Sequence, residues 1–182
     1  MSLEQKSVLL TDAENRGNIE AVMDYILAWT LKMCDTSHYE GAVDKSLLLE
    51  CRKIMSKLIG VDVTAHDCAV ETYFEWKKID LVVEVHLGDR EYHTILIENK
   101  VKAYLPPHEL ATNKRVFKEY YDADNECIQH FILLCAYSPV PKYMIEQSET
   151  DGFNCITLEE LTDYNAPDVG NAIFDEFWRR TW

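Results

Sequence analysis

A short polar group ends an apolar run near the middle of the chain. In TILIENKVKA, residues 94–103, Glu98, Asn99 and Lys100 follow Ile95–Ile97 directly. A carboxylate and an ammonium two residues apart can form a salt bridge, and the carboxylate together with a second acid can hold a divalent cation. Asp80, in the upstream segment KKIDLVVEV, is the candidate for that second acid. Whether the two acids meet depends on the elements that carry them.

The register of two neighbouring predicted strands decides whether Asp80 and Glu98 meet. A turn centred on Asp89 would place Asp80 directly opposite Glu98 and keep the apolar residues of both strands on a shared face. A two-residue turn at Gly88 and Asp89 would instead set Asp80 against Ile97 and mix the faces. We therefore predict the first register, in which Glu98 and Lys100 share one side of the strand and Asn99 faces the other.

Opposed carboxylates on neighbouring strands repel each other, because their β-carbons lie only about 4.5–5.5 Å apart. Lys100 could offset the repulsion by a salt bridge alone. A divalent cation such as Mg²⁺ could do so by binding one or two carboxylates together with water and phosphate oxygens. Lys100 would then be placed to orient or deprotonate an attacking water.

The periodicity of apolar residues predicts a mixed sheet with helices packed on it. The pattern changes from a spacing of 3.6 to one of 2 after Gly60. The expected order is helices over 18–33 and 45–58, strands over 68–76, 78–87 and 92–99, a helix over 108–124, a strand over 128–137, a short strand entering a helix over 154–164, and a terminal helix over 166–182 with Pro167 near its start. This order is typical of an α/β or α+β fold.

Composition and charge narrow the function classes. The 182 residues are 47% hydrophobic and suit one domain, and no apolar stretch is long enough to span a membrane, so we expect a cytoplasmic protein. The six cysteines lack the spacing of a zinc site. A net charge of −14 argues against a free-standing nucleic-acid binder. Candidate local cations for such a contact are Lys102, Lys114 and Arg115, although composition alone favours a solvated helix face.

KKIDLVVEV followed by ILIENKVKA resembles the PD-(D/E)xK nuclease superfamily, and is most similar to a subgroup of mostly uncharacterised microbial proteins with an IENK motif. The resemblance implies a restriction-endonuclease-like αβββαβ core with a mixed central sheet. It also implies that Asp80, Glu98 and the backbone carbonyl of Asn99 bind Mg²⁺ (or Mn²⁺), and that Lys100 assists the attacking water in cleaving DNA. We expect one domain over 1–182, with a helical part over 1–60, a catalytic core over about 61–140, and a C-terminal strand and helices over 150–182.

Several positions depart from that pattern or leave it open. Ile79 stands where proline is frequent, and the glutamine that anchors DNA in the exonuclease branch has no counterpart before Tyr120 or Tyr121. The extra glutamate that such nucleases take from their first helices could be Glu20, Glu40 or Glu50, and we favour Glu40 because it lies in the break between two helices. Glu71 fits a metal role and a surface salt bridge equally well.

Three hypotheses follow from the sequence. The first is a Mg²⁺-dependent nuclease acting on DNA. The second is a catalytically inactive protein of the same fold that binds nucleic acid or a protein. The third is an unrelated α/β protein in which Asp80, Glu98 and Lys100 form only a salt-bridge network. Many nucleases of this superfamily cut two strands as dimers, so a homodimer is a further expectation, with the terminal FWRRTW as a candidate interface.

Overall fold

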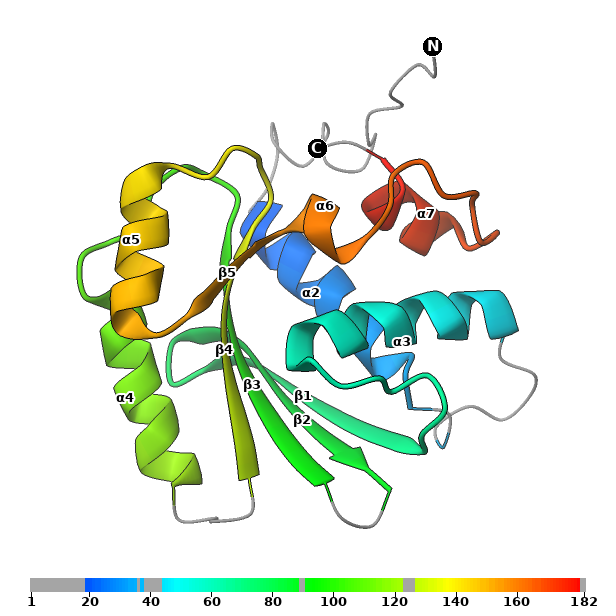
Figure 1. Ribbon diagram of the computed structural model, residues 1–182, viewed down its shortest axis with the longest axis horizontal. Coiled ribbons are helices and arrows are strands. Elements are labelled where there is room, and N and C mark those ends of the chain that lie inside the picture. The colour runs from blue at the N-terminus through cyan, green and yellow to red at the C-terminus, as the bar shows by residue number, and fades with distance from the viewer. Residues whose placement is uncertain (1–18, 36, 38–43, 89–90, 123–126, 181–182) are drawn as a thin grey trace.

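A five-stranded mixed sheet forms the centre of the protein (Figure 1). The computed structural model describes residues 19–35, 37, 44–88, 91–122 and 127–180. Strands β1 (Cys68–Trp76), β2 (Ile79–Leu87) and β3 (Glu91–Lys100) form an antiparallel meander. Strands β4 (Cys127–Cys135) and β5 (Asn154–Thr157) continue the sheet in parallel with β3. The predicted mixed sheet and the αβββαβ order are confirmed.

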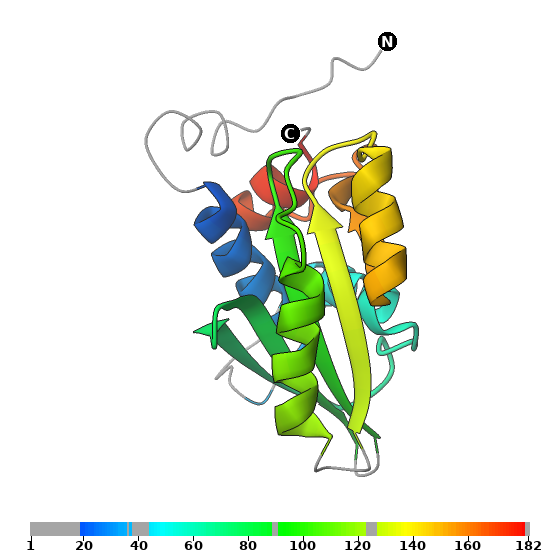
Figure 2. The same cartoon turned by 90° about the vertical axis from the view of Figure 1, so that its left-hand side faces the viewer.

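Helices cover both faces of the sheet. On one face lie α2 (Ile19–Lys32), α3 (Lys45–Ile59), α6 (Leu158–Leu161) and α7 (Ala172–Trp178), and on the other lie α4 (Glu109–Tyr121) and α5 (Lys142–Asp151) (Figures 1 and 2). The helix α4 makes the crossover between the parallel strands β3 and β4, as such a connection requires. Within the described ranges, no helix has the length and apolar character needed to cross a membrane.

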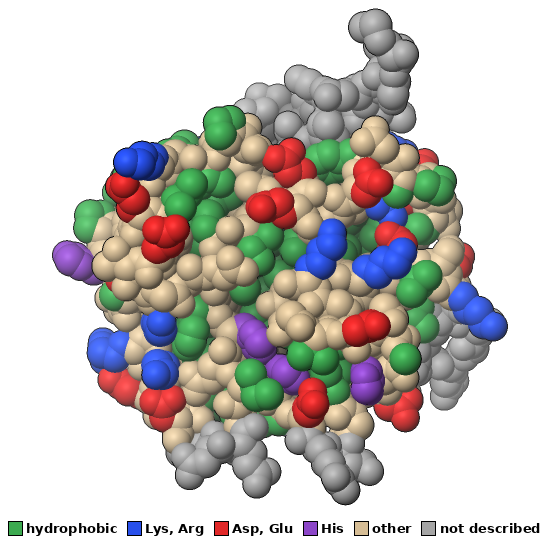
Figure 3. Space-filling view, viewed as in Figure 1, with side chains coloured by type: hydrophobic (Ala, Val, Ile, Leu, Met, Phe, Trp, Pro, Cys, Tyr) green, Lys and Arg blue, Asp and Glu red, His purple; other side chains and the backbone are tan. Residues whose placement is uncertain are grey.

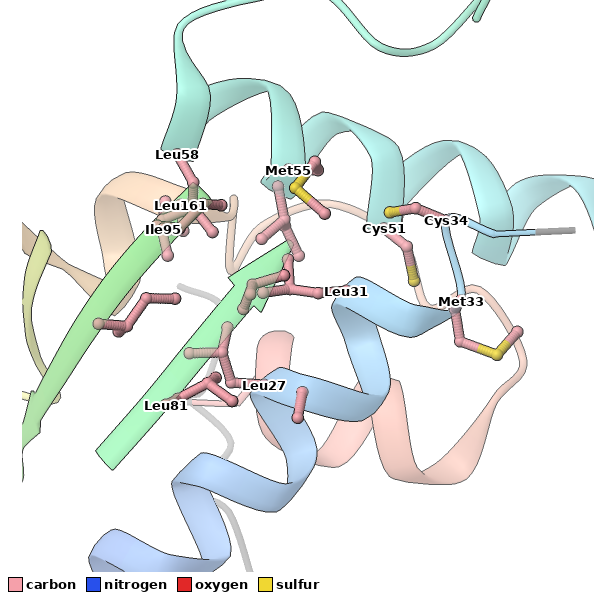
Figure 4. Packing of buried hydrophobic residues seen from close by; sticks show 14 of the residues in the cluster. Leu27, Leu31, Met33, Cys34, Cys51, Met55, Leu58, Leu81, Ile95 and Leu161 are labelled. Atoms are coloured by element: carbon pink, nitrogen blue, oxygen red, sulfur yellow. The ribbon is translucent and has the colours of Figure 1, made fainter. Parts of the chain in front are cut away.

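The central strands are buried on both faces, and this fixes their register. Leu81 pairs with Ile97, as predicted, and both side chains lie in the core against α2 and α3. Leu96 points to the opposite core against α4. Figure 4 shows Leu27, Leu31, Met55 and Leu58 of the two helices packed over Leu81 and Ile95. A slip of one residue would exchange the two sets of side chains, and each full burial contributes about 1.5–3 kcal/mol, so other registers are strongly disfavoured.

Two elements differ from the sequence prediction. The helix α5 was not predicted, because only Met144 and Ser148 of its ten residues are buried and its apolar pattern is correspondingly weak. The last helix begins at Ala172 rather than near Pro167. Asn171 caps it by accepting a hydrogen bond from the Phe174 N–H, and the carboxylate of Asp175 accepts hydrogen bonds from the backbone of the preceding loop. That loop is therefore ordered without being helical.

Candidate active site

Asp80 and Glu98 come together where the β2–β3 pairing reaches its end. Continuing the register by one residue beyond Leu81 and Ile97 places the two acids opposite each other, as the sequence predicted. Asp80 Oδ2 accepts a hydrogen bond from the backbone N–H of Asn99 at 3.0 Å. The backbone of one proposed metal-binding residue thus orients the carboxylate of another.

Glu98 is the most deeply buried acid of this group, with only 1% of its surface exposed. Its Oε1 accepts a hydrogen bond from Asn113 Nδ2 of α4 at 2.6 Å, and its Oε2 lies 3.8 Å from the ammonium of Lys100. Burial, and next the charge of Asp80, raise the pKa of Glu98 well above its usual value, against the opposing effect of Lys100. The surroundings of Glu98 therefore favour its neutral form, and its carboxylate form has too little positive charge beside it.

Lys100 lies on the same side of β3 as Glu98, as alternation requires. Its Nζ forms an ion pair with Glu109 of α4 at 3.1 Å. Burial lowers the pKa of Lys100, but Glu109, Asp80 and Glu98 together outweigh burial and raise that pKa above its usual value. Lys100 is therefore a protonated ammonium at neutral pH.

Asn99 faces the opposite side and joins the site to α2. Its Nδ2 donates a hydrogen bond to Asp24 Oδ1, and the N–H of the next residue, Val101, donates to Glu20 Oε1 at 3.4 Å. Burial raises the pKa of Asp24 to about 7, with Asp80 and Glu20 adding to the rise and the hydrogen bond from Asn99 opposing it. Two acids of α2 thus reach the site from the face opposite α4.

The structure also bears on which glutamate of the first helices contributes. Glu20 lies beside the end of β3, whereas Glu50 of α3 lies elsewhere and binds Arg179 and Lys53. Glu40, which the sequence favoured, lies outside the described residues. The sequence analysis overlooked Asp24 and Glu109. The signal for both was a spacing of four residues, from Glu20 to Asp24 on α2 and from Glu109 to Asn113 on α4, which puts each pair on one side of its helix.

Glu71 is not brought to this group of acids. It lies exposed on β1, where its carboxylate is 3.4 Å from the ammonium of Lys32 of α2. Both side chains are about half exposed, so the pair contributes little to stability. Its surroundings match the salt-bridge interpretation and not the metal-binding one.

The three candidate nucleic-acid contacts have different surroundings. Lys102 is exposed in the turn directly after β3. The ammonium of Lys114 donates to the backbone oxygens of Asp151 and Gly152 at the end of α5, and Arg115 forms an ion pair with Glu119. On the face shown in Figure 3, cations near the lower part of α4 lie beside acids. Lys114 and Arg115 are thus engaged within the protein, and Lys102 follows Lys100 by two residues.

The oxygen donors of the site fit a hard divalent cation. Across the described part of the chain, no three Asp, Glu, His or Cys side chains form a ready metal cluster. Mg²⁺ does not require one, because it typically takes one or two carboxylates and fills its other positions with water and substrate. A divalent ion would supply the positive charge that the carboxylate form of Glu98 lacks. Asn99 Oδ1, buried and without a hydrogen-bond partner among the described residues, is a further unsatisfied polar atom, on the face of β3 that carries Asp24.

Comparison with known proteins identifies the family. The model of the PD-(D/E)XK nuclease superfamily matches residues 8–171, which include Lys100 and every acid described in this site. No match was found among curated proteins or among solved structures. The match removes the hypothesis of an unrelated α/β protein and supports a nuclease-like function. The chain belongs to the PD-(D/E)XK nuclease superfamily.

Proposed function

We propose that this protein is a nuclease that hydrolyses phosphodiester bonds of DNA and depends on Mg²⁺ or Mn²⁺. The main support is the convergence of Asp80, Glu98 and Lys100 at the end of the β2–β3 hairpin, with Glu98 buried although its charge is poorly compensated. Buried acids with strongly raised pKa values gather at functional sites, because burial without a partner has no benefit for folding.

In this proposal each residue has a distinct role. Asp80, Glu98 and the backbone carbonyl of Asn99 hold the metal ion, which when bound polarises the phosphate and lowers the pKa of water. Asn113 fixes the rotation of the Glu98 carboxylate by its hydrogen bond. Glu20 and Asp24 add negative charge from α2 and are candidates for contacts through water.

Lys100 acts as a donor and not as a base. Because Glu109 and the neighbouring acids keep it protonated, its ammonium can orient the attacking water by a hydrogen bond and stabilise negative charge that develops on the phosphate oxygens. Glu109 is a positioning residue that holds the Lys100 side chain in place.

The alternative is a catalytically inactive member of the superfamily that binds nucleic acid or a protein. The net charge of −14 favours it, because such a charge weakens nonspecific attraction to DNA. The opposed carboxylates weigh against it, since a binding module has no need to keep two acids that repel each other on paired strands. We therefore place the nuclease first.

Cleavage assays test the proposal. Wild type, Asp80→Ala and Lys100→Ala would be incubated with supercoiled plasmid, single-stranded and duplex DNA, and RNA of the same sequence, each in Mg²⁺, Mn²⁺ or EDTA. We expect metal-dependent cleavage of DNA by the wild type and a loss of at least about 100-fold in both variants. Lys142→Ala, which removes an exposed lysine of α5, serves as the control and should cut normally. Inert wild type on every substrate, or full activity in Lys100→Ala, would contradict the proposal.

The same preparations test the remaining parts of the proposal. Cleavage rates on DNA and RNA of the same sequence measure the preference for DNA over RNA. Light scattering of the purified protein would show whether it forms the homodimer that cutting two strands favours. A monomer that cuts only one strand would limit the enzyme to single-strand cleavage.

A further inference from the structure

The tip of the β1–β2 hairpin carries aromatic rings and lysines beside the acids. We call Trp76, Lys77, Lys78 and Tyr120 of α4 the hairpin cluster. Trp76 pairs across the hairpin with Ile79, the residue directly before Asp80. Figure 2 shows the hairpin curling outward beside α4 and below α2. The hairpin cluster therefore begins one residue from a proposed metal ligand, on elements that also carry the site.

The rings and the cation of the hairpin cluster contact one another in a fixed arrangement. The ring of Trp76 lies 5.0 Å from that of Tyr120, nearly perpendicular to it, and the ammonium of Lys77 lies 4.6 Å from the first ring and 5.3 Å from the second. Tyr120 is 55% exposed, and both lysines are exposed. The next residue, Tyr121, is buried and donates a hydrogen bond to Glu84 Oε1 at 2.7 Å, which anchors this end of α4. The exposed ring is thus presented from a rigid base.

The backbone of the turn does not explain why lysines occupy it. Lys77 and Lys78 have φ values of 52° and 75°, so both central residues of this two-residue turn are left-handed. Asn-Gly and similar pairs are strongly preferred there, because a left-handed conformation costs a residue with a β-carbon about 1–2 kcal/mol. Strained residues of this kind gather at functional sites. The turn therefore keeps two cations at its tip against the local preference.

A second aromatic pair flanks the acids from the other side. Tyr25 of α2 and Phe74 of β1 have ring centroids 4.7 Å apart, and both are exposed. Tyr25 directly follows Asp24, which binds Asn99. Exposed aromatic side chains thus lie on both α2 and α4, the two helices that contribute acids to the site.

We propose that the hairpin cluster binds unpaired nucleotides of a nucleic-acid strand, so that a single-stranded segment is the substrate of the site. Bases stack on exposed aromatic rings whatever their sequence, and lysines contact the phosphates. In a duplex the faces of the bases are covered by neighbouring bases, so the aromatic side chains cannot stack on them. Stacking also requires no large positive surface, which suits a protein of charge −14. The inference rests on the proposed function for what happens to the phosphate, but the binding itself can be measured separately.

Binding without cleavage is the first test. Fluorescence anisotropy of a labelled single-stranded 12-nucleotide DNA, with the duplex of the same sequence in parallel, would be measured in EDTA and in Ca²⁺. We expect the single strand to bind at least about 10-fold more tightly than the duplex. Tyr120→Ala should weaken binding at least about 5-fold, while Tyr120→Phe, which keeps the ring, should bind within twofold of wild type. The logarithm of the binding constant falls as the logarithm of the salt concentration rises. Lys77→Gln combined with Lys78→Gln should make this negative slope shallower by about 1.4.

Matched controls identify nonspecific effects. Lys142→Gln alters an exposed lysine of α5, away from the hairpin, and should bind within twofold of wild type. Thermal melting of each variant verifies that it is folded. Equal binding of single strand and duplex, no binding of either, or unchanged binding in Tyr120→Ala would each overturn the inference.

The same variants separate this inference from the proposed function. If wild type does not cut but Tyr120→Ala loses binding of the single strand, the nuclease proposal fails and the hairpin cluster stands as a binding surface. If wild type cuts, and Tyr120→Ala both binds and cuts single strands as well as wild type does, the nuclease proposal stands and the hairpin cluster has no such role.

Discussion

Two glutamates with little exposure, Glu98 and Glu50, have opposite electrostatic surroundings. Although burial raises the pKa of Glu50, hydrogen bonds from Lys53 and Arg179 outweigh burial and lower that pKa. Arg179 Nη2 lies 2.5 Å from Glu50 Oε2, and its Nη1 donates to Thr162 Oγ1 and to the Asp163 carbonyl oxygen. The pKa of Glu98 is instead raised, because burial and next the charge of Asp80 outweigh the opposing effect of Lys100, whose ammonium also pairs with Glu109.

The difference separates a structural ion pair from an acid that the chain itself does not neutralise, as the proposed metal site requires. An acid whose charge is matched within the chain can join elements, and the pair of the partly exposed Glu50 and Arg179 joins α3 to the residues after α7. A buried acid in excess over its cations reduces stability unless a ligand supplies positive charge. Four measurements can sharpen or break this distinction, and they follow in order of expected effect.

The largest effect is expected on cleavage. Glu98→Gln keeps the shape of the side chain and its acceptor for Asn113 but removes the charge, and should lower the cleavage rate at least about 100-fold. Glu50→Gln makes the same chemical change outside the site and should cut within about threefold of wild type. The rates would be measured on the substrate that wild type cuts best. Similar losses in both variants would show that the different surroundings of Glu98 and Glu50 have no bearing on cleavage.

For folding stability, Glu50→Gln should have a larger effect than Glu98→Gln. Glu50→Gln leaves the buried guanidinium of Arg179 without its carboxylate and should lower the free energy of unfolding by about 2–3 kcal/mol, less than for a fully buried pair because Glu50 is partly exposed. Glu98→Gln should leave that free energy unchanged or raise it by about 1 kcal/mol at pH 8, since the variant lacks a carboxyl whose pKa is raised by folding and which therefore destabilises the folded state at this pH. Urea unfolding in EDTA measures both. A large loss of stability in Glu98→Gln would identify Glu98 as a structural residue.

Metal binding should stabilise the acid site and leave the Glu50 pair unaffected. Mg²⁺ or Mn²⁺ at ten to a hundred times its dissociation constant should raise the free energy of unfolding by about 1.4–2.7 kcal/mol. The melting temperature would be compared with and without EDTA in wild type, Asp80→Asn and Glu50→Gln. The rise should disappear in the first variant and persist in the second. A metal-dependent rise of the same size in Asp80→Asn would place the ion elsewhere.

The smallest effect concerns pH. The pKa of Asp24 is raised to about 7 in the folded protein from a usual value of 3.8, so between these pH values the folded state binds more protons than the unfolded state. Stability without metal should therefore fall as pH rises from about 4 to about 7, with about 1–2 kcal/mol due to Asp24. The difference between wild type and Asp24→Asn, measured by urea unfolding at several pH values, isolates this contribution. A difference that does not vary with pH would exclude the shift.

The strands and their register could be predicted because the information is local. Leu81, Val83, Ile95 and Ile97 alternate with residues of the opposite face, so one pairing satisfies both cores and carries Asp80 to Glu98. The position of Lys100 beside Glu98 follows from the same alternation.

The contributions of the helices could not be predicted in the same way. Asp24 and Glu109 occupy helix positions that an ordinary solvated acid would also occupy, and only the crossing of α2 and α4 over the end of β3 brings them to the site. The sequence pattern favours Tyr120 as a core or interface aromatic. In the structure its side chain is more than half exposed, because Tyr121 fills the buried position. Contacts between distant segments depend on packing geometry, which periodicity does not specify.

Glu20 lies in the first turn of α2, whereas Asp80 and Glu98 lie on paired strands and Asp24 lies one turn further inside the helix. Glu20 therefore reaches the backbone of Val101 from a helix end, whose first N–H groups have no partner within the helix. Helix ends open at a lower free energy than paired central strands do. Partial unfolding should therefore break the contact of Glu20 with Val101 before it separates Asp80 from Asn99.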